Sequence, residues 1–283
     1  MTTSHVRPLA RALKSVLLTG ALAATVLAAA PAVASAAGPS INAVDFTGIV
    51  ALSNCSGAVV RTANSLPSDP ALVMSNGHCV KFFAAGEVIV NQASSRTFSL
   101  LNSAGTRSIG TLRANRLAYG TMTKTDVSFY QLTITYQQLQ NNFGSRALTL
   151  SSTHPTVGEP IRVVSGFHRQ IYPCNIDAFA FRLREDRWTW EDSIRYTSAC
   201  HTIPGTSGSP VEDANTSQIV GINNTLNEQG QRCTLDNPCE VDQNGNVTIH
   251  QNIGYGQETY YIAACIGPGS RFDLTRPGCG LPR

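Results

Sequence analysis

Eight cysteines limit what this chain can fold into more than any other sequence feature. An even number of cysteines in an exported chain indicates disulfides, not free thiols. Many pairings are possible, and we predict that neighbours along the sequence pair. No histidine lies at zinc-ligand spacing from any cysteine, so we predict no metal site. The predicted disulfides are Cys55–Cys79, Cys174–Cys200, Cys233–Cys239 and Cys265–Cys279.

The first 36 residues have the features of an export signal. The basic residues Arg7, Arg11 and Lys14 precede an apolar stretch, and the segment ends in the small residues 34–36. The apolar stretch is shorter than the ~18 residues that a membrane-spanning helix needs, which disfavours the alternative of an uncleaved anchor. We therefore predict a signal peptide over residues 1–36 and a secreted, extracellular protein without membrane association after cleavage.

The charge balance beyond this segment argues against a nucleic-acid partner. The whole chain has 21 Lys and Arg against 18 Asp and Glu, but the predicted signal holds three of the cations and no acid. The remaining chain is therefore formally neutral and has no basic run. Such a surface lacks the electrostatic footprint that nucleic acids or anionic lipids require. We also expect a monomer.

Short β-prone segments dominate the rest of the chain. Runs rich in Val, Ile, Thr and Tyr alternate with clusters of Gly, Asn, Pro and Ser, which is typical of sandwiches and barrels. Only Tyr136–Phe143 could form a short helix, and Asn244-Gly245 predicts a hairpin. We predict an all-β protein with an N-terminal domain over 37–145 and a C-terminal domain over 146–283. The predicted strands are 47–52, 57–61, 71–74, 87–91, 126–135, 160–164, 218–222 and 247–251.

A glycine-flanked serine is the first candidate for chemistry. In the sequence Gly-Thr-Ser-Gly-Ser-Pro at 205–210, Gly205 and Gly208 allow a tight turn that exposes Ser207. Backbone N–H groups on such a turn can stabilise the oxyanion of an acyl-transfer reaction. The alternative is an ordinary turn between two strands.

A nucleophilic serine needs a base, and His78 is the best candidate. It follows the apolar run 71–74 and precedes Cys79, so it should lie on a turn at the end of a strand. Imidazole accepts a proton near neutral pH, which suits this role. The remaining histidines, His154, His168, His201 and His250, are interpreted as structural or exposed.

Asp126 is the candidate for orienting that histidine. It begins an alternating, strand-like segment, and an acid at the head of a buried strand needs a partner. The rival acids are Asp177, Asp186 and Asp192. The last two lie in the charged segment 182–192, which we expect to be a solvated face or an exposed loop.

The order histidine, aspartate, serine, with the flanking residues Gly-His-Cys, Asp-Val-Ser and Gly-x-Ser-Gly-x-Pro, resembles the chymotrypsin-like serine peptidases. The resemblance covers most of the chain beyond the signal. It implies two antiparallel six-stranded Greek-key barrels with the active site in the cleft between them. It further implies an endopeptidase that hydrolyses protein or peptide substrates through an acyl-enzyme, without a cofactor. The implied triad is His78, Asp126 and Ser207, with an oxyanion hole made by the N–H groups of Gly205 and Ser207.

The serine motif is most similar to that of the glutamyl endopeptidase branch. Asn223, however, stands where that branch has a pocket histidine. Five residues should line the primary pocket by the same resemblance, and all are uncharged, so we expect a preference for uncharged side chains before the scissile bond. Asp236 and Glu240 could overturn this expectation, because the loop held by Cys233 and Cys239 could fold either acid into the pocket. The five residues are Thr202, Ile203, Asn223, Asn224 and Thr225.

Two other functions deserve comparison with these motifs. A lipase or esterase would have Gly-x-Ser-x-Gly and a triad in the order serine, acid, histidine. Ser209 replaces the second glycine, and only His250 follows Ser207. A catalytically silent binding module on the same scaffold would usually have lost a triad residue, whereas this chain keeps all three. A reactive fluorophosphonate probe would separate the silent module from the enzyme.

Overall fold

A computed structural model describes residues 45–283 of the chain. The predicted signal peptide over residues 1–36 lies outside the described residues. Within them, strands predominate, and the helices are one α-helix and two short 3-10 helices. None of the described helices has the length and apolar character to cross a membrane.

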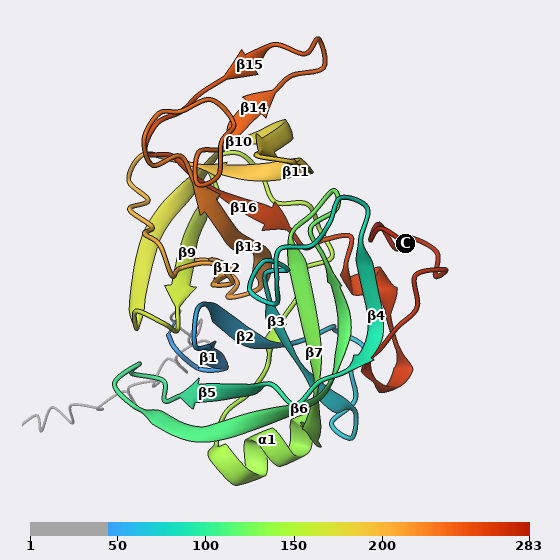
Figure 1. Cartoon of the computed structure of the whole chain (residues 1–283). Helices are drawn as coiled ribbons and strands as arrows, with labels where there is room; N and C mark the ends of the chain where they lie inside the picture. The colour runs from blue at the N-terminus through green and yellow to red at the C-terminus, as the bar shows by residue number, and fades with distance from the viewer. Residues whose placement is uncertain (1–44) are drawn as a thin grey trace, which may run out of the picture. The chain divides into compact units, whose positions relative to one another are not determined.

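The first half of the described chain forms a closed barrel (Figure 1). Its strands pair in the order β1-β5-β6-β7-β3-β2, and β1 also pairs with β2, which closes a six-stranded antiparallel ring. β4 pairs with β6 outside the ring, and β8 runs parallel to β2. The bounds are β1 Ile49–Ala51, β2 Ser56–Arg61, β3 Pro70–Ser75, β4 Val88–Ala93, β5 Thr97–Leu101, β6 Ser108–Thr121, β7 Val127–Thr135, α1 Tyr136–Phe143 and β8 Leu148–Thr149.

The second half repeats this architecture. The pairings β9–β10, β10–β11, β11–β16, β16–β13, β13–β12 and β12–β9 close a second antiparallel ring of six strands. The predicted all-β fold with two six-stranded barrels is therefore confirmed. The division into domains at residues 145 and 146 stays a prediction. The bounds are β9 Pro160–Ser165, β10 Gln170–Glu185, β11 Trp188–Tyr196, β12 Pro210–Asp213, β13 Ile219–Leu226, β14 Cys239–Val241, β15 Val247–Thr248, β16 Gly254–Glu258, η1 Ala263–Cys265, β17 Ile266–Gly267, η2 Pro268–Ser270 and β18 Arg271–Phe272.

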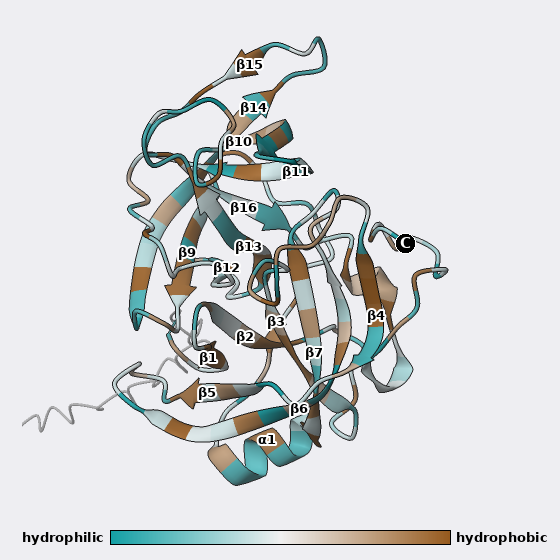
Figure 2. Ribbon diagram, in the orientation of Figure 1, coloured by the Kyte–Doolittle hydropathy of each residue, from teal (hydrophilic) through white to brown (hydrophobic). Residues whose placement is uncertain are grey.

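Apolar side chains fill each ring and also join the two. Val59 and Leu100 belong to the core of the first barrel, and Val163 and Ile194 to the core of the second. Another cluster contains residues of both barrels and of the C-terminal segment, whose η2 and β18 pack against β3 and β6 of the first barrel. Figure 2 shows that apolar residues occupy the first part of β4 and parts of β7, whereas α1 is largely polar. Burial of these side chains holds the two barrels in one compact body.

The predicted helix over Tyr136–Phe143 is confirmed as α1. Thr135 and Gln138 form a reciprocal capping box at its start, and Gly144 adopts a left-handed conformation at its end. The Asn244-Gly245 hairpin is confirmed as well, because Val241 pairs with Val247 across this turn. Local sequence signals of this kind operate without help from the rest of the chain.

The charged segment 182–192 was expected to be a solvated face or an exposed loop; the loop is wrong, and the solvated face holds for only one side of the segment. It contains the end of β10, the turn and the start of β11, with Arg182 opposite Glu191 and Glu185 opposite Trp188. Charged and apolar residues alternate along it, so one face of the hairpin is exposed and the other is buried. Glu185, Trp188 and Trp190 lie on the buried face. The indole N–H groups of Trp188 and Trp190 donate to Phe83 O and Met122 O of the first barrel.

The four cysteine pairs predicted from sequence order are the four that the structure joins. Cys55 precedes β2 and Cys79 follows β3, so their bridge holds the turn that carries His78. Cys174 of β10 is linked to Cys200, a few residues before Ser207. Two of the bridges therefore brace the segments that present the candidate site.

We predict that removing the Cys55–Cys79 bridge lowers the free energy of unfolding by about 3 kcal/mol, because a closed loop of this size restricts the unfolded chain. The bridge spans 24 positions, whereas Cys233–Cys239 spans six, so a matched Cys233→Ala/Cys239→Ala variant should lose about 1 kcal/mol less. Denaturant unfolding of the Cys55→Ala/Cys79→Ala variant tests this. Mass mapping of the non-reduced protein that joined Cys79 to another cysteine would contradict it.

Candidate active site

Strand register brings His78 and Asp126 together. β3 and β7 pair antiparallel with Ser75 opposite Ser128, so the turn after β3 meets the residue that precedes β7. The distance from His78 Nδ1 to Asp126 Oδ2 is 2.7 Å, and the His78 backbone N–H donates to Asp126 Oδ1 at 3.0 Å. Asp126 is fully buried, while the His78 side chain is partly exposed. One carboxylate thus holds both the ring and the backbone of the histidine.

Neighbouring side chains and one glycine allow this approach. A Cβ atom on Gly77 would lie 2.1 Å from Thr121 O and 2.9 Å from Asp126 Oδ1, so the position accepts no side chain. The Asn76 side-chain amide donates to Asp126 O, and the Ser128 hydroxyl donates to Asn76 O. The histidine–aspartate pair therefore sits on a braced turn.

The surroundings of His78 favour its protonated form. Burial lowers the pKa of His78, but the charge of Asp126 and the hydrogen bond to it raise the pKa. Glu185 and Asp236 add smaller increases through their negative charges. The net result is a pKa above the ordinary value of 6.5.

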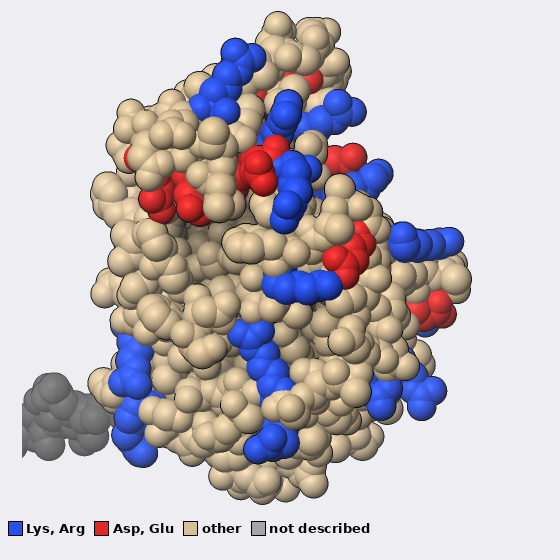
Figure 3. Space-filling view, viewed as in Figure 1, with Lys and Arg blue, Asp and Glu red and all other residues tan. Residues whose placement is uncertain are grey.

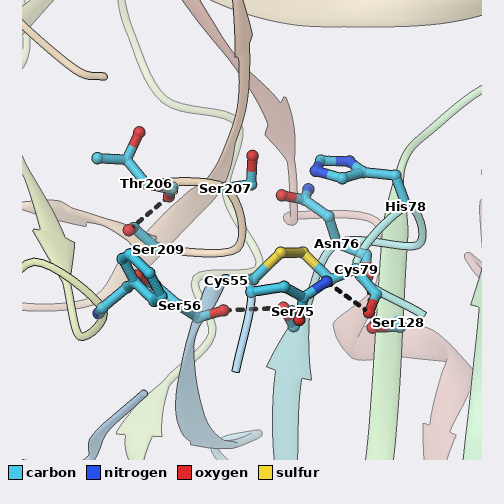
Figure 4. The surroundings of a disulfide bond; sticks show 12 residues. Cys55, Ser56, Ser75, Asn76, His78, Cys79, Ser128, Thr206, Ser207 and Ser209 are labelled. Atoms are coloured by element: carbon cyan, nitrogen blue, oxygen red, sulfur yellow. Dashed lines mark hydrogen bonds between the residues drawn. A yellow bond between two sulfur atoms is a disulfide. The ribbon is translucent and has the colours of Figure 1, made fainter. Parts of the chain in front are cut away.

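Ser207 belongs to the second barrel but contacts the first. The Ser56 N–H donates to Ser207 O at 2.8 Å, and Gly208, with a φ of +80°, comes so close that a Cβ would lie 2.2 Å from Ser56 O. Figure 4 shows the Ser207 hydroxyl and the His78 ring on the same side of the Cys55–Cys79 disulfide. The hydroxyl donates to Asn224 O at 3.2 Å. Among residues 45–283 it makes no hydrogen bond to His78, a looseness that free enzymes often show before substrate binds.

Two backbone N–H groups beside Ser207 are unused. Thr206 N–H donates to Ile203 O and Gly208 N–H to Asn223 O. The N–H groups of Gly205 and Ser207 have no acceptor within the described part of the chain. Gly205 has a φ of +92°, a conformation that favours glycine. These free donors are available to a negative charge that develops next to the serine oxygen.

A cavity connects these groups. It is lined by His78, Asp126 and Ser207 and by all five predicted pocket residues. Figure 3 shows the hollow on this face of the molecule, with acidic side chains at its edge. The structure thus brings together every residue that the sequence proposed for catalysis or substrate binding. The five pocket residues are Thr202, Ile203, Asn223, Asn224 and Thr225.

The cavity also contains acids, so the expectation of an uncharged pocket rests on an incomplete set of residues. Glu185, Glu228 and Asp236 line the same cavity. Asp236 was one of the two acids that the sequence analysis named as able to enter the pocket. The other, Glu240, binds Arg195 at 2.9 Å and does not line the cavity. Glu185 was missed because its segment was interpreted as exposed. The alternation of charged and apolar residues over 182–192 was the signal that could have revealed it.

Glu185 is the buried member of this group, with 5% of its surface exposed. Its carboxylate accepts hydrogen bonds from the Thr225 hydroxyl at 2.6 Å and from the Asp236 N–H at 3.1 Å. Burial raises the pKa of Glu185 to about 7, although the bond from Thr225 lowers it. This side chain can therefore change charge near neutral pH on the cavity that it shares with His78.

The rival acids have other partners. Asp177 binds Arg195 at 2.7 Å, and Asp192 lies 3.2 Å from His154. Asp186 is exposed at the hairpin turn. Asp126 is the acid that contacts His78.

Comparison with models of protein families identifies the family of this chain. A model of the trypsin-like peptidase domain matches residues 55–222, and no curated protein matches the sequence. The solved structures that resemble the chain include the MamO protease domain from Magnetospirillum magneticum, with 13% identity, a TM-score of 0.46 and coverage of 76% of this chain and 94% of that one. The active form of the Rv3671c protease from M. tuberculosis has 17% identity and a TM-score of 0.45, with coverage of 83% and 81%.

The Nocardiopsis protease has 16% identity and a TM-score of 0.41, with coverage of 76% of this chain and 93% of that one. With identities and TM-scores this low, the solved structures are reported only as similar chains. The domain match spans more than half of the chain and includes His78, Asp126 and Ser207. On that match, the chain belongs to the trypsin-like peptidase domain family.

Proposed function

We propose that this chain is a secreted serine endopeptidase in which His78, Asp126 and Ser207 hydrolyse peptide bonds. The observation that carries the proposal is the 2.7 Å contact between His78 and the fully buried Asp126, on a cavity that also contains Ser207. A histidine held by a carboxylate beside a serine is the arrangement that activates a serine hydroxyl.

The reaction follows from these positions. Neutral His78 takes the proton of the Ser207 hydroxyl while Oγ attacks the substrate carbonyl carbon. The carbonyl oxygen becomes an oxyanion, and the free N–H groups of Gly205 and Ser207 stabilise it. His78 then gives its proton to the departing amine, which leaves an ester on Ser207. Water repeats the sequence, with His78 as base, and releases the acid product.

Asp126 acts on the histidine and not on the substrate. Its contact with Nδ1 keeps that nitrogen protonated, so Nε2 is the nitrogen that accepts the serine proton. It also stabilises the imidazolium that forms. The presence of all three groups on one cavity favours an enzyme over the silent binding module. Four disulfides suit a protein that works outside the cell.

The acids in the cavity support a substrate preference for basic side chains near the scissile bond. A desolvated lysine or arginine needs a carboxylate partner, and Glu185, Glu228 and Asp236 offer three. Asn224 adds a polar group, because the residue is 3% exposed and neither polar atom of its side chain has a partner among the described residues. The similarity to the glutamyl endopeptidase branch is not carried into specificity, since anionic groups would repel a glutamate.

Replacing Ser207 with alanine should lower turnover by about 10^6-fold while leaving the fold intact, because the nucleophile is lost. Ser209→Ala is the matched control. The Ser209 hydroxyl is buried and donates to Thr206 O at 2.6 Å, so this change should affect stability more than chemistry. Peptide hydrolysis and circular dichroism of both variants decide the matter. An active Ser207→Ala protein with an inactive Ser209→Ala protein would mean that the other serine is the nucleophile.

The pH dependence of kcat/KM should depend on the negative charges around His78. Because Asp126, Glu185 and Asp236 raise the pKa of His78, kcat/KM should rise with pH through a midpoint above 6.5 as the base loses its proton. Glu185→Gln removes one negative charge, so the pKa of His78 should fall and the midpoint should move to lower pH. Glu240→Gln, which changes an acid outside the cavity, should leave the midpoint in place. An unchanged profile in Glu185→Gln would refute the electrostatic link.

Digestion of a peptide library should yield cuts enriched for Lys or Arg near the scissile bond. Asp236→Asn should reduce that enrichment roughly tenfold, since a hydrogen bond to a charged group is worth about 1.5 kcal/mol or more. Asp186→Asn alters an exposed acid of the β10–β11 turn that does not line the cavity, and it should change nothing. If uncharged residues dominate the cuts in all three proteins, the cavity acids do not select substrate.

A further inference from the structure

A second group of ionisable side chains meets away from the candidate active site. His154 follows β8, Asp192 lies in β11 and Glu258 ends β16, and none of the three lines the cavity at Ser207. One ligand atom from each lies within 4.8 Å of the other two. The separations from His154 Nε2 are 3.2 Å to Asp192 Oδ2 and 3.7 Å to Glu258 Oε1.

Glu258 is the member of this group whose carboxylate is buried without a hydrogen-bond donor. Its side chain is fully buried, and neither carboxylate oxygen accepts a hydrogen bond from any described residue. The His154 ring at 3.7 Å is too far for one. A buried carboxylate without donors is costly unless it is paired with a cation or binds a metal. Burial raises the pKa of Glu258 to about 9, so this carboxylate is charged at neutral pH only when a positive charge lies where it faces Asp192 and His154.

His154 is oriented as metal-binding histidines usually are. Its Nδ1 lies 2.6 Å from Pro155 O, and because a carbonyl can only accept, Nδ1 must carry the proton. Nε2 faces the two carboxylates and contacts Asp192 Oδ2, and in the neutral ring its lone pair can bind a metal placed between them. Phe179 and Tyr260 pack against the ring, with centroid distances of 4.4 and 4.9 Å. A backbone carbonyl that fixes the tautomer is the common outer-layer partner of a ligating histidine.

We propose that His154, Asp192 and Glu258 form a binding site for one zinc ion. Zinc accepts histidine nitrogen and carboxylate oxygen at about 2.0–2.1 Å in tetrahedral geometry, which places neighbouring ligand atoms about 3.3 Å apart. The distances of 3.2 and 3.7 Å from Nε2 lie close to that value. Calcium prefers six to eight oxygen ligands, so an imidazole among three donors favours zinc.

The surroundings complete the site. His154 and Asp192 are partly exposed, which lets an ion enter and lets water supply the fourth ligand. The Tyr260 hydroxyl donates to Asp192 Oδ2 at 3.2 Å and restrains it. An ion here would link the connection between the barrels to β11 and the end of β16, so its role would be structural. A sequence search for histidines near cysteines could not find it, because its ligands come from three distant segments.

The test is zinc binding by the full chain, freed of metal with EDTA and carrying Ser207→Ala to prevent self-digestion. Equilibrium dialysis against zinc chloride should give one zinc per chain. Zinc at a hundred times its dissociation constant should raise the midpoint of thermal unfolding by several degrees. Both readouts are independent of peptidase activity.

Three variants locate the ion. Glu258→Gln and Asp192→Asn should each weaken zinc binding at least tenfold, and Asp192 is exposed enough for its variant to fold even if the Glu258 variant does not. Glu240→Gln is the matched control. Glu240 Oε1 also lies 3.7 Å from a histidine nitrogen, in His250, but Arg195 already neutralises it, so zinc binding should persist. Absence of zinc binding, or binding unchanged in Asp192→Asn, would overturn the proposal in favour of a protonated His154 between two acids.

Discussion

A carboxylate with no exposed surface must find its donors inside the protein, and Asp126 finds both on one residue. The ring and the backbone N–H of His78 each bind one of its oxygens. The β3–β7 register brings the two residues to the same edge, Gly77 leaves room for them, and Cys79 anchors the turn. The candidate site is organised around this pair, because moving either partner would leave a buried charge without a donor.

The first barrel carries His78 and Asp126, and the nucleophile reaches them only across the junction of the two barrels. Ser207 comes from the second barrel, and the close contact between Gly208 and Ser56 sets how near it lies to His78. On the other side of the cleft, Trp188 and Trp190 dock on backbone carbonyls of the first barrel. Both contacts depend on backbone atoms at short range, so small shifts between the barrels would change the geometry of the serine and the histidine together.

The acids of the cavity couple substrate selection to the base. Glu185 and Asp236 raise the pKa of His78, and burial raises that of Glu185 to about 7. A basic substrate side chain beside these acids would oppose their negative charge at His78. Binding such a side chain would therefore favour the neutral, active form of the base. One set of charges would thus contribute both to recognition and to the protonation state needed for attack.

Local signals in the sequence were sufficient for much of this protein. Short β-prone runs predict strands, and the glycines at 205 and 208 predict the tight turn at Ser207, because these effects act between residues close in the chain. Neighbouring cysteines predicted all four bridges. The resemblance of the flanking motifs to a known family supplied the order of the barrels and the expected roles.

Only the tertiary structure decided what meets across the barrels. The hairpin that contains Glu185 has a charged composition that suggests an exposed loop, and its burial depends on tryptophans that find their acceptors in the other barrel. The same holds for His154, Asp192 and Glu258, which are far apart in sequence and adjacent in space. Charge in a side chain can be read from the sequence. Whether that charge faces water, a substrate or another charge depends on packing between distant segments, and no local pattern encodes it.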